Sequence, residues 1–300
     1  MDFRIKCLLQ TIFSFVPRGE ILNYFFQKYI ARTFPPDNNY FLGKTAFAFL
    51  HYNNFLKYNK LEIRNGKYYE FGAGWTLEIP LSMGFLGFDV HCIDIRKLIV
   101  PELIMDTLAK FESNKDELPF RICPVKNENI KNVIITEQLK NNYRVNYIAP
   151  MDARNTSFED NSFDFISSTS TLEHIPKEDI LPILKECYRI LNKGGVMSLI
   201  IDYKDHWSYF DKSISNFNFL RYSSKEWKKF NPSLHYQNRL RHSEYIDLIS
   251  QTNFKVVNIL TFGSNDNVNK AFKAMECAAD FENYMFDDLI IGESRMVLLK

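Results

Sequence analysis

Residues 67–94 constrain the fold of this chain more than any other stretch, because they predict a strand, a glycine turn and a helix in direct succession. Residues 67–71 read KYYEF, a short aromatic run next to glycine that is typical of a buried strand. Gly72-Ala73-Gly74 predicts a sharp turn, and residues 76–84 carry apolar side chains at helical spacing. A strand, a glycine turn and a helix in this order bring backbone N–H groups close to a nucleotide-like ligand.

A second predicted strand, residues 90–95, carries Asp94 about 20 residues beyond Gly74. An acidic residue in this position can accept hydrogen bonds from two ribose hydroxyls. The dinucleotide-binding fingerprint is a competing interpretation, but it needs a third glycine where Leu77 stands. An ordinary tight turn is the other alternative. The rest of the sequence distinguishes between these interpretations.

Composition narrows the function classes. With 300 residues, 46% apolar, 24% charged and a net charge of +1, the chain suits one large α/β domain and has no electrostatic preference for nucleic acid. The five cysteines are scattered without metal-ligand spacing, which predicts a reduced cytoplasmic protein without a metal site. No apolar run approaches the roughly 20 residues of a membrane span, and a peripheral membrane contact is left open.

Strand and helix patterns alternate along most of the chain. Strands are predicted over 67–71, 90–95, 145–149, 163–168, 196–201, 256–262 and 295–300. Helices are predicted over 76–84, 100–111, 130–140, 177–191, 243–251 and 270–284. This order predicts an α/β fold with a Rossmann-like, seven-stranded, mostly parallel sheet and a reversed last strand.

Two further segments flank this pattern. Residues 1–66 contain predicted helices over 21–34 and 45–58, which either cover the sheet or form a wall of the substrate pocket, and the two roles are compatible. Residues 203–242 are dense in aromatic, basic and histidine residues and predict a lid over the substrate.

Four segments match the pattern of a known family in order and spacing. They are Glu70-Phe71-Gly72-Ala73-Gly74, Asp94, residues 152–164 and residues 191–195. In these segments the chain resembles the class I S-adenosylmethionine-dependent methyltransferases. The resemblance implies S-adenosylmethionine as cofactor and a methyltransferase domain over residues 67–300. In this interpretation residues 1–66 are an N-terminal helical cap, and the lid is an insertion at about 203–242.

The resemblance also implies roles for the first glycine-rich segment. Gly72 and Gly74 would admit the cofactor where a β-carbon would collide, with Ala73 between them in the same turn. Glu70 would orient this turn or meet the methionine ammonium through a water molecule.

The other cofactor contacts come from the next two segments. Asp94 would bind the ribose hydroxyls, and Ile95 would pack on adenine. Asp152 would accept a hydrogen bond from the adenine amine, and Ala153 would donate its backbone N–H. The alternative for either aspartate is a capping or turn carboxylate.

Two histidines are the candidate general bases. His174 lies in the sequence Thr171-Leu172-Glu173-His174-Ile175, just after the fourth predicted strand, where ligands bind in open α/β sheets. His206 follows the fifth strand, with Asp202 near enough in sequence to orient its imidazole. A structural role is the alternative for each histidine.

A basic group in the predicted lid has two interpretations. His235, Arg239, Arg241 and His242 could form a cationic wall for a phosphate or carboxylate of the substrate, or a solvated basic face.

A narrower similarity concerns the substrate. Residues 74–81, 94–96, 201–206, 218–220 and 237–241 are similar to a bacterial methyltransferase group associated with cell-surface polysaccharide biosynthesis. This similarity implies O-methylation of a sugar or a sugar-linked group. A methyltransferase of small metabolites, such as a quinone precursor or an amino compound, is the alternative enzyme. A non-catalytic methyltransferase-like binding protein is the alternative outside enzymes. The sequence determines neither the acceptor nor the oligomeric state.

Overall fold

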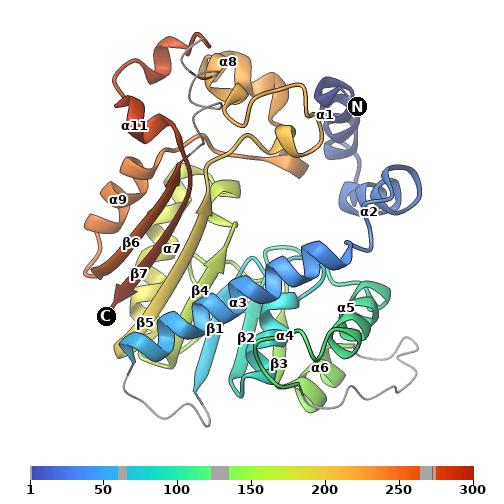
Figure 1. The fold of residues 1–300 in the computed structure, drawn as a ribbon, viewed down its shortest axis with the longest axis vertical. Helices are drawn as coiled ribbons and strands as arrows, with labels where there is room; N and C mark the ends of the chain where they lie inside the picture. The colour runs from blue at the N-terminus through green and yellow to red at the C-terminus, as the bar shows by residue number, and fades with distance from the viewer. Residues whose placement is uncertain (1, 60–65, 123–134, 264–271, 273–274) are drawn as a thin grey trace.

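Seven strands form one sheet in the order β3-β2-β1-β4-β5-β7-β6, in a computed structural model that describes residues 2–59, 66–122, 135–263, 272 and 275–300 (Figure 1). Strands β1 to β5 pair in parallel, and β7 runs antiparallel to both of its neighbours. The strands are β1 (Lys67–Phe71), β2 (Asp89–Ile93), β3 (Val145–Ile148), β4 (Phe163–Thr169), β5 (Leu191–Asp202), β6 (Lys255–Gly263) and β7 (Ile291–Leu299). The predicted fold class is confirmed.

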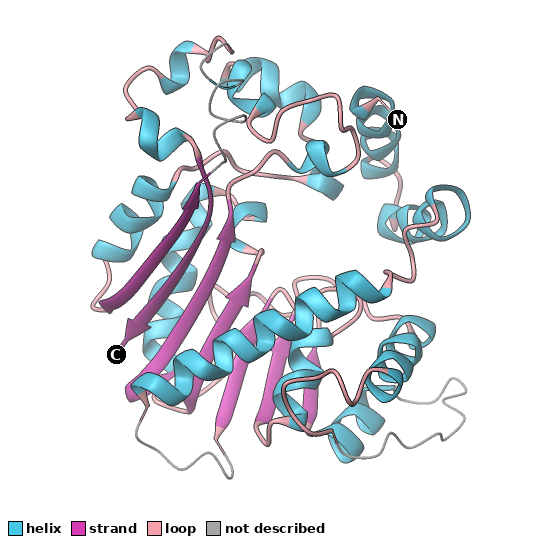
Figure 2. Cartoon of the chain, in the orientation of Figure 1, coloured by secondary structure: helices cyan, strands magenta, loops and turns pink. Residues whose placement is uncertain are grey.

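Helices cover both faces of this sheet, as Figure 2 shows. The helices of the described residues are α1 (Phe3–Ser14), α2 (Gly19–Phe25), α3 (Asn38–Tyr58), α4 (Glu78–Phe85), α5 (Pro101–Ser113), α6 (Ile135–Tyr143), α7 (Lys177–Ile190), α8 (Ser224–Trp227), α9 (His242–Ser250) and α11 (Phe286–Leu289). Of these, α1, α2, α8 and α11 lie beyond the ends of the strands rather than on a face of the sheet. A π-helical turn, Phe26–Ala31, continues α2.

The aromatic sequence of β1 follows from burial on both faces. Successive side chains of a strand point to opposite sides, so Tyr68 and Tyr69 enter different apolar clusters. Tyr68 packs with Phe55 of α3 and Phe165 of β4, whereas the cluster on the other face includes Cys187 of α7. A central parallel strand therefore needs no solvent-facing side, which explains the aromatic residues Tyr68, Tyr69 and Phe71.

Helix α3 crosses the sheet diagonally in Figure 1 and combines both roles considered for the N-terminal helices. Asp37 caps its first turn, because the aspartate side chain accepts a hydrogen bond from the Tyr40 amide. Phe41 and Phe55 lie in the core, whereas Tyr40 and Lys44 line a cavity described below.

The segment over residues 203–242 folds into short helices around aromatic side chains. Besides α8, it contains the 3-10 turns His206–Tyr209, Asn218–Arg221, Lys228–Phe230 and Ser233–His235. Trp207 and Trp227 are buried in a third apolar cluster that also contains Phe3 of α1 and Phe281. This cluster joins the segment to the N-terminal helix.

One predicted helix, residues 270–284, is wrong over residues 275–284, although residue 272 is helical. In place of a helix up to residue 284, residues 275–284 contain one 3-10 turn, Ala279–Phe281; of residues 270–274, only 272 is among the described residues. The Ala278 amide donates to the carbonyl of Leu220 at 2.9 Å, a tertiary hydrogen bond that replaces the helical one. Periodicity could not reveal this distant partner.

Several boundaries also differ from the predictions. Helix α3 begins at Asn38 instead of residue 45, and β7 begins at Ile291 instead of residue 295. Strand β5 begins at Leu191 instead of residue 196, although Gly194 adopts the expected positive φ of 80°. Helix α6 begins at Ile135, and the earlier part of the predicted helix, residues 130–134, lies outside the described residues. None of the helices in the described parts of the chain has the length and apolar character needed to cross a membrane.

Candidate functional site

A cavity of about 810 Å³ lies at the carboxyl ends of β1 to β4. The turns that follow these strands line it, together with α3 and the start of α7. Ligands of open α/β sheets bind at this edge, outside the carboxyl ends of the strands. The lining includes all eight residues that the sequence predicts for the cofactor: Glu70, Gly72, Ala73, Gly74, Asp94, Ile95, Asp152 and Ala153.

The glycine turn requires glycine for two different reasons. Gly72 has φ +76°, and a β-carbon there would lie only 2.3 Å from Thr171 Cγ2. Gly74 has φ +72°, but no atom lies within 4 Å of the place of its β-carbon. The positive φ therefore favours glycine at both positions. At Gly72 the close approach of the loop after β4 is a second reason.

Asp94 connects this turn to the end of β2. Its Oδ2 accepts a hydrogen bond from the Gly74 amide at 3.1 Å, and its Oδ1 accepts one from the Arg96 amide at 3.1 Å. The carboxylate is buried, which raises its pKa, although these amides oppose the increase. The adjacent Ile95 is 64% exposed and lines the cavity, an accessible apolar surface for a flat ligand.

Glu70 is a buried carboxyl at the end of β1. The hydroxyl of Tyr68 donates to its Oε2 at 2.8 Å. Burial raises the pKa of Glu70 to about 8, despite this hydrogen bond and the charge of Lys44. Because a neighbouring cation would favour its ionised form, Glu70 is suited to a positively charged group in the cavity.

At the opposite end of the cavity, Asp152 already has a protein partner. The guanidinium of Arg154 donates to both of its carboxylate oxygens, from Nε at 3.0 Å and from Nη2 at 2.6 Å. These bonds lower the pKa of Asp152. Arg154 also donates to Asp179 at 2.7 Å, so α7 holds this loop in place. The Arg154 amide donates to Oδ1 at 2.9 Å as well. Donors of Arg154 therefore already occupy the roughly four lone-pair positions of this carboxylate, and a further donor has to share or replace one of them.

His174 reaches the same cavity from the turn after β4. Its Nδ1 lies 2.7 Å from the carbonyl oxygen of Tyr236. Because a carbonyl only accepts hydrogen bonds, Nδ1 carries the proton and Nε2 keeps its lone pair. The His174 side chain is accessible from the cavity. Desolvation by the surrounding protein and the neighbouring His206 lower its pKa to about 4, so the imidazole is neutral at pH 7.

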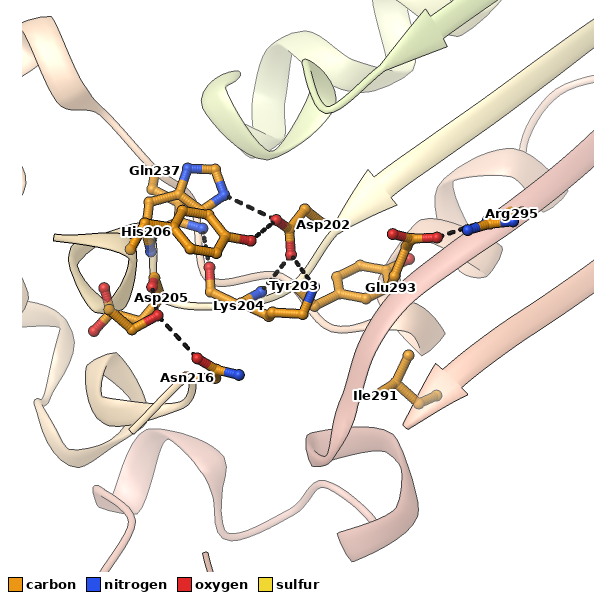
Figure 3. A network of polar contacts seen from close by, with 12 residues as sticks. Asp202, Tyr203, Lys204, Asp205, His206, Asn216, Gln237, Ile291, Glu293 and Arg295 are labelled. Carbon is orange, nitrogen blue, oxygen red and sulfur yellow. Dashed lines mark hydrogen bonds and ion pairs between the residues drawn. The ribbon is translucent and has the colours of Figure 1, made fainter. Parts of the chain in front are cut away.

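His206 lies behind His174, outside the lining of the cavity. The two ring centroids are 4.8 Å apart in an edge-to-face arrangement. Nε2 of His206 is 3.5 Å from Asp202 Oδ2, and Figure 3 shows this carboxylate between His206 and Lys204. Burial opposes ionisation of Asp202, but contact with His206 and the charge of Lys204 outweigh it and lower the pKa to about 2. The predicted pair therefore assembles, with His174 as its cavity-facing member.

Sequence reasoning missed two side chains of α3 that line the cavity. Tyr40 and Lys44 are four residues apart and therefore lie on one face of the helix. Burial would lower the pKa of Lys44, but acidic neighbours, including Glu78 and Glu70, raise it above its usual value. The i, i+4 spacing was visible in the sequence, but nothing local indicated which face would meet the cavity.

The two arginines of the basic group in the predicted lid stabilise the fold. The guanidinium of Arg241 is fully buried and donates to the carbonyls of Tyr203, Leu289 and Ile291. Arg239 donates to the Phe219 carbonyl at 3.0 Å. Neither arginine lines the cavity, so the proposed cationic wall is wrong for both. These arginines donate to backbone carbonyls at the ends of structural elements and in the segment after β5.

Comparison with known proteins gives one family match. Residues 127–199 match a family model described as "Methyltransferase domain", and no curated protein matches the chain. Together with the seven-stranded sheet, this match supports an S-adenosylmethionine-dependent methyltransferase, an enzyme of class EC 2.1.1, with S-adenosylmethionine as cofactor.

Solved structures with a similar fold share little sequence with this chain. A SAM-dependent methyltransferase from Methanosarcina mazei is 15% identical over 82% of this chain and 96% of its own, with a TM-score of 0.43. Geranyl diphosphate C-methyltransferase from Streptomyces coelicolor, in complex with Mg²⁺, geranyl diphosphate and S-adenosylhomocysteine, is 10% identical over 85% and 79%, with a TM-score of 0.47. The [4+2]-cyclase SpnF is 12% identical over 85% and 81%, with a TM-score of 0.46.

Proposed function

We propose that this protein is an O-methyltransferase of the cytoplasm that modifies a sugar or a sugar-linked group in surface-glycan assembly. The observation that carries the proposal is the position of His174. Its neutral imidazole lines the same cavity as the glycine turn and Asp94, with the proton fixed on Nδ1. A hydroxyl acceptor has a high pKa and benefits from a positioned group that removes its proton.

The cavity residues fit S-adenosylmethionine. Gly74 leaves open space where a side chain would project, and the Asp94 carboxylate has a fixed orientation beside it. We assign the ribose hydroxyls to Asp94, the adenine to Ile95, Asp152 and Ala153, and the methionine ammonium to Glu70. When bound, this cofactor supplies a methyl group activated by a sulfonium. The chain has to align an acceptor with it, and alignment alone can lower a barrier by roughly 7–11 kcal/mol.

The cavity wall near His174 supports a hydroxyl-rich acceptor. Ser170, Thr171, Ser233 and Tyr236 line this part, and their polar atoms can hydrogen-bond to sugar hydroxyls. Apolar and aromatic side chains of Phe34, Pro36, Trp75 and Leu234 line the cavity as well. A sugar ring combines polar edges with apolar faces, so such a mixed wall suits it.

The N-terminal helices support a lipid-linked form of the acceptor. Exposed large apolar side chains concentrate there: Ile5, Leu8, Ile12, Phe15, Val16, Ile21, Leu22, Phe25, Tyr29 and Ile30. Arg4, Arg18 and Arg32 are exposed among them. Apolar side chains accompanied by basic ones are the pattern of a surface that rests on anionic lipid.

Calorimetric titration with S-adenosylmethionine and S-adenosylhomocysteine is the first test. We expect micromolar binding, followed by methyl transfer to nucleotide sugars or lipid-linked saccharides, detected as a 14 Da mass increase. Transfer only to quinone precursors or amino compounds would establish the alternative enzyme. Absence of binding by folded protein would leave the non-catalytic binding protein.

A further inference from the structure

Three potential metal ligands meet beside the cavity, and one of them, His174, lines it. Glu173 and His174 lie on the 3-10 turn Leu172–His174 after β4, and His206 begins the turn His206–Tyr209 after β5. One ligand atom from each residue lies within 4.8 Å of the other two. The scattered cysteines and histidines predicted no metal site, because these ligands come from two loops far apart in sequence.

Glu173 is the most informative of the three. Its side chain is 1% exposed, and neither carboxylate oxygen has a hydrogen-bond partner. Buried carboxylates in proteins are normally hydrogen-bonded, paired with a cation or bound to a metal. The charge of Lys44 acts on Glu173, but no donor in the described residues makes a hydrogen bond to either oxygen. Both oxygens are therefore available to a metal ion.

His174 is oriented as metal-binding histidines usually are. A ligating imidazole typically donates its other N–H to a backbone carbonyl or a carboxylate. His174 has the carbonyl of Tyr236 at 2.7 Å from Nδ1, which leaves Nε2 as the ligand atom. Nε2 of His206 lies 3.5 Å from the Asp202 carboxylate but makes no hydrogen bond, so this buried nitrogen has no hydrogen-bond partner among the described residues.

We propose that Glu173, His174 and His206 bind a divalent first-row transition metal ion, with Zn²⁺ as the reference ion. Two imidazoles and one carboxylate are a known ligand set for Zn²⁺, and three protein ligands leave a coordination position open. Tetrahedral ligands at about 2.0–2.2 Å from the metal lie about 3.4 Å apart. The ligand atoms lie within 4.8 Å of one another, so metal binding requires them to approach by up to about 1.4 Å.

The open position gives the site a role that rests on the proposed function. His174 lines the cavity, so an oxygen of the acceptor can reach a metal bound to its Nε2. A hydroxyl bound to a divalent cation has a lowered pKa. In the metal-bound protein His174 is thus a ligand, and the cation activates the acceptor hydroxyl. Metal binding itself does not depend on this role.

The test is calorimetric titration of ZnCl₂ into full-length, tag-free protein after removal of metal with EDTA and dialysis. We expect one equivalent per chain for the natural protein. Glu173→Gln and His206→Gln should each weaken binding at least tenfold. His91→Gln, which removes a histidine of β2 beside Asp89, is the matched control and should bind like the natural protein.

Thermal unfolding without metal tests whether each variant is folded. Because Glu173 has no hydrogen-bond partner, Glu173→Gln should melt at or above the temperature of the natural protein without metal and should lose the increase that Zn²⁺ causes. Equal zinc affinity in the natural protein, Glu173→Gln and His206→Gln, or no zinc binding at all, would overturn the proposal. S-adenosylmethionine binding with no zinc binding would refute this site alone, whereas zinc binding with no cofactor binding would refute the proposed function alone.

Discussion

The Gly74 amide donates a hydrogen bond to Asp94 Oδ2 at 3.1 Å, so the turn after β1 and the end of β2 form one unit. Strands β1 and β2 are parallel neighbours, and their carboxyl ends therefore meet at the same edge of the sheet. The acidic residue is held in position by the turn before any ligand arrives. Such preorganisation reduces the conformational entropy lost on binding.

Asp94→Asn should weaken S-adenosylmethionine binding about 10- to 100-fold. The substitution removes the charge from a carboxylate assigned to two ribose hydroxyls, and hydrogen bonds to charged groups contribute about 1.5–3 kcal/mol. Isothermal titration calorimetry measures the loss. Asp89→Asn, at the other end of the same strand, is the control and should bind normally. An unchanged dissociation constant for Asp94→Asn would remove Asp94 from the cofactor site.

Gly72→Ala should destabilise the fold more than Gly74→Ala. Both substitutions place a side chain at positive φ, which costs about 1–2 kcal/mol, but only the first creates a 2.3 Å contact with Thr171. Urea unfolding measures both free energies. Removing the contacting atoms with Thr171→Ala should bring the cost of Gly72→Ala close to that of Gly74→Ala. If the cost stays the same in that background, steric contact is not its cause.

Gly43→Ala should stabilise the protein by about 0.5–1 kcal/mol. Gly43 lies inside α3 with no atom within 4 Å of its missing β-carbon, and alanine has the higher helix propensity. Its urea unfolding curve should shift to a higher midpoint with an unchanged slope. A decrease in stability would mean that a methyl group at this position disturbs the packing of α3.

His51 should make stability depend on pH below about 6.5. Burial lowers its pKa from 6.5 to about 3, and its ring contacts Ser198 Oγ at 2.7 Å and Thr169 Oγ1 at 2.9 Å. The unfolded chain binds a proton below 6.5 and the folded chain does not. The stabilisation is therefore complete above 6.5 and is lost as pH falls towards 3, on the order of 2–4 kcal/mol.

Comparison with His51→Asn isolates this contribution. Between pH 6.5 and pH 4 the unfolding free energy of the natural protein should fall more steeply than that of the variant. Parallel curves would show that the pKa of His51 is the same in the folded and the unfolded protein.

His174→Gln should lower turnover about 10²- to 10⁴-fold and change cofactor affinity less than threefold. The imidazole lines the cavity, but the residues assigned to the cofactor lie on other loops. Initial rates and cofactor titration on the same preparation separate the two effects. A proportionate loss of cofactor affinity would instead make His174 part of the cofactor site.

The parts of the fold that depend on residues close together in the chain can be predicted from the amino-acid sequence. The buried aromatic strand before Gly72, the glycine turn and the alternation of strands and helices follow from side-chain periodicity and from the conformational freedom of glycine. The alternation also restricts the topology, because consecutive parallel strands need helical crossovers. The placement of Asp94 followed from the same local pattern.

Contacts between residues that are far apart in the sequence could be identified from the three-dimensional structure alone. Lys44 reaches the cavity because α3 crosses the sheet at one angle, and buried Arg241 donates to three backbone carbonyls, of Tyr203, Leu289 and Ile291. Glu173 and His206 approach each other because β4 and β5 are neighbours in the sheet. The periodicity of apolar side chains indicates which face of a helix or strand is apolar. These contacts depend instead on how separate elements pack together. That packing is a property of the whole chain, and it created the group of Glu173, His174 and His206.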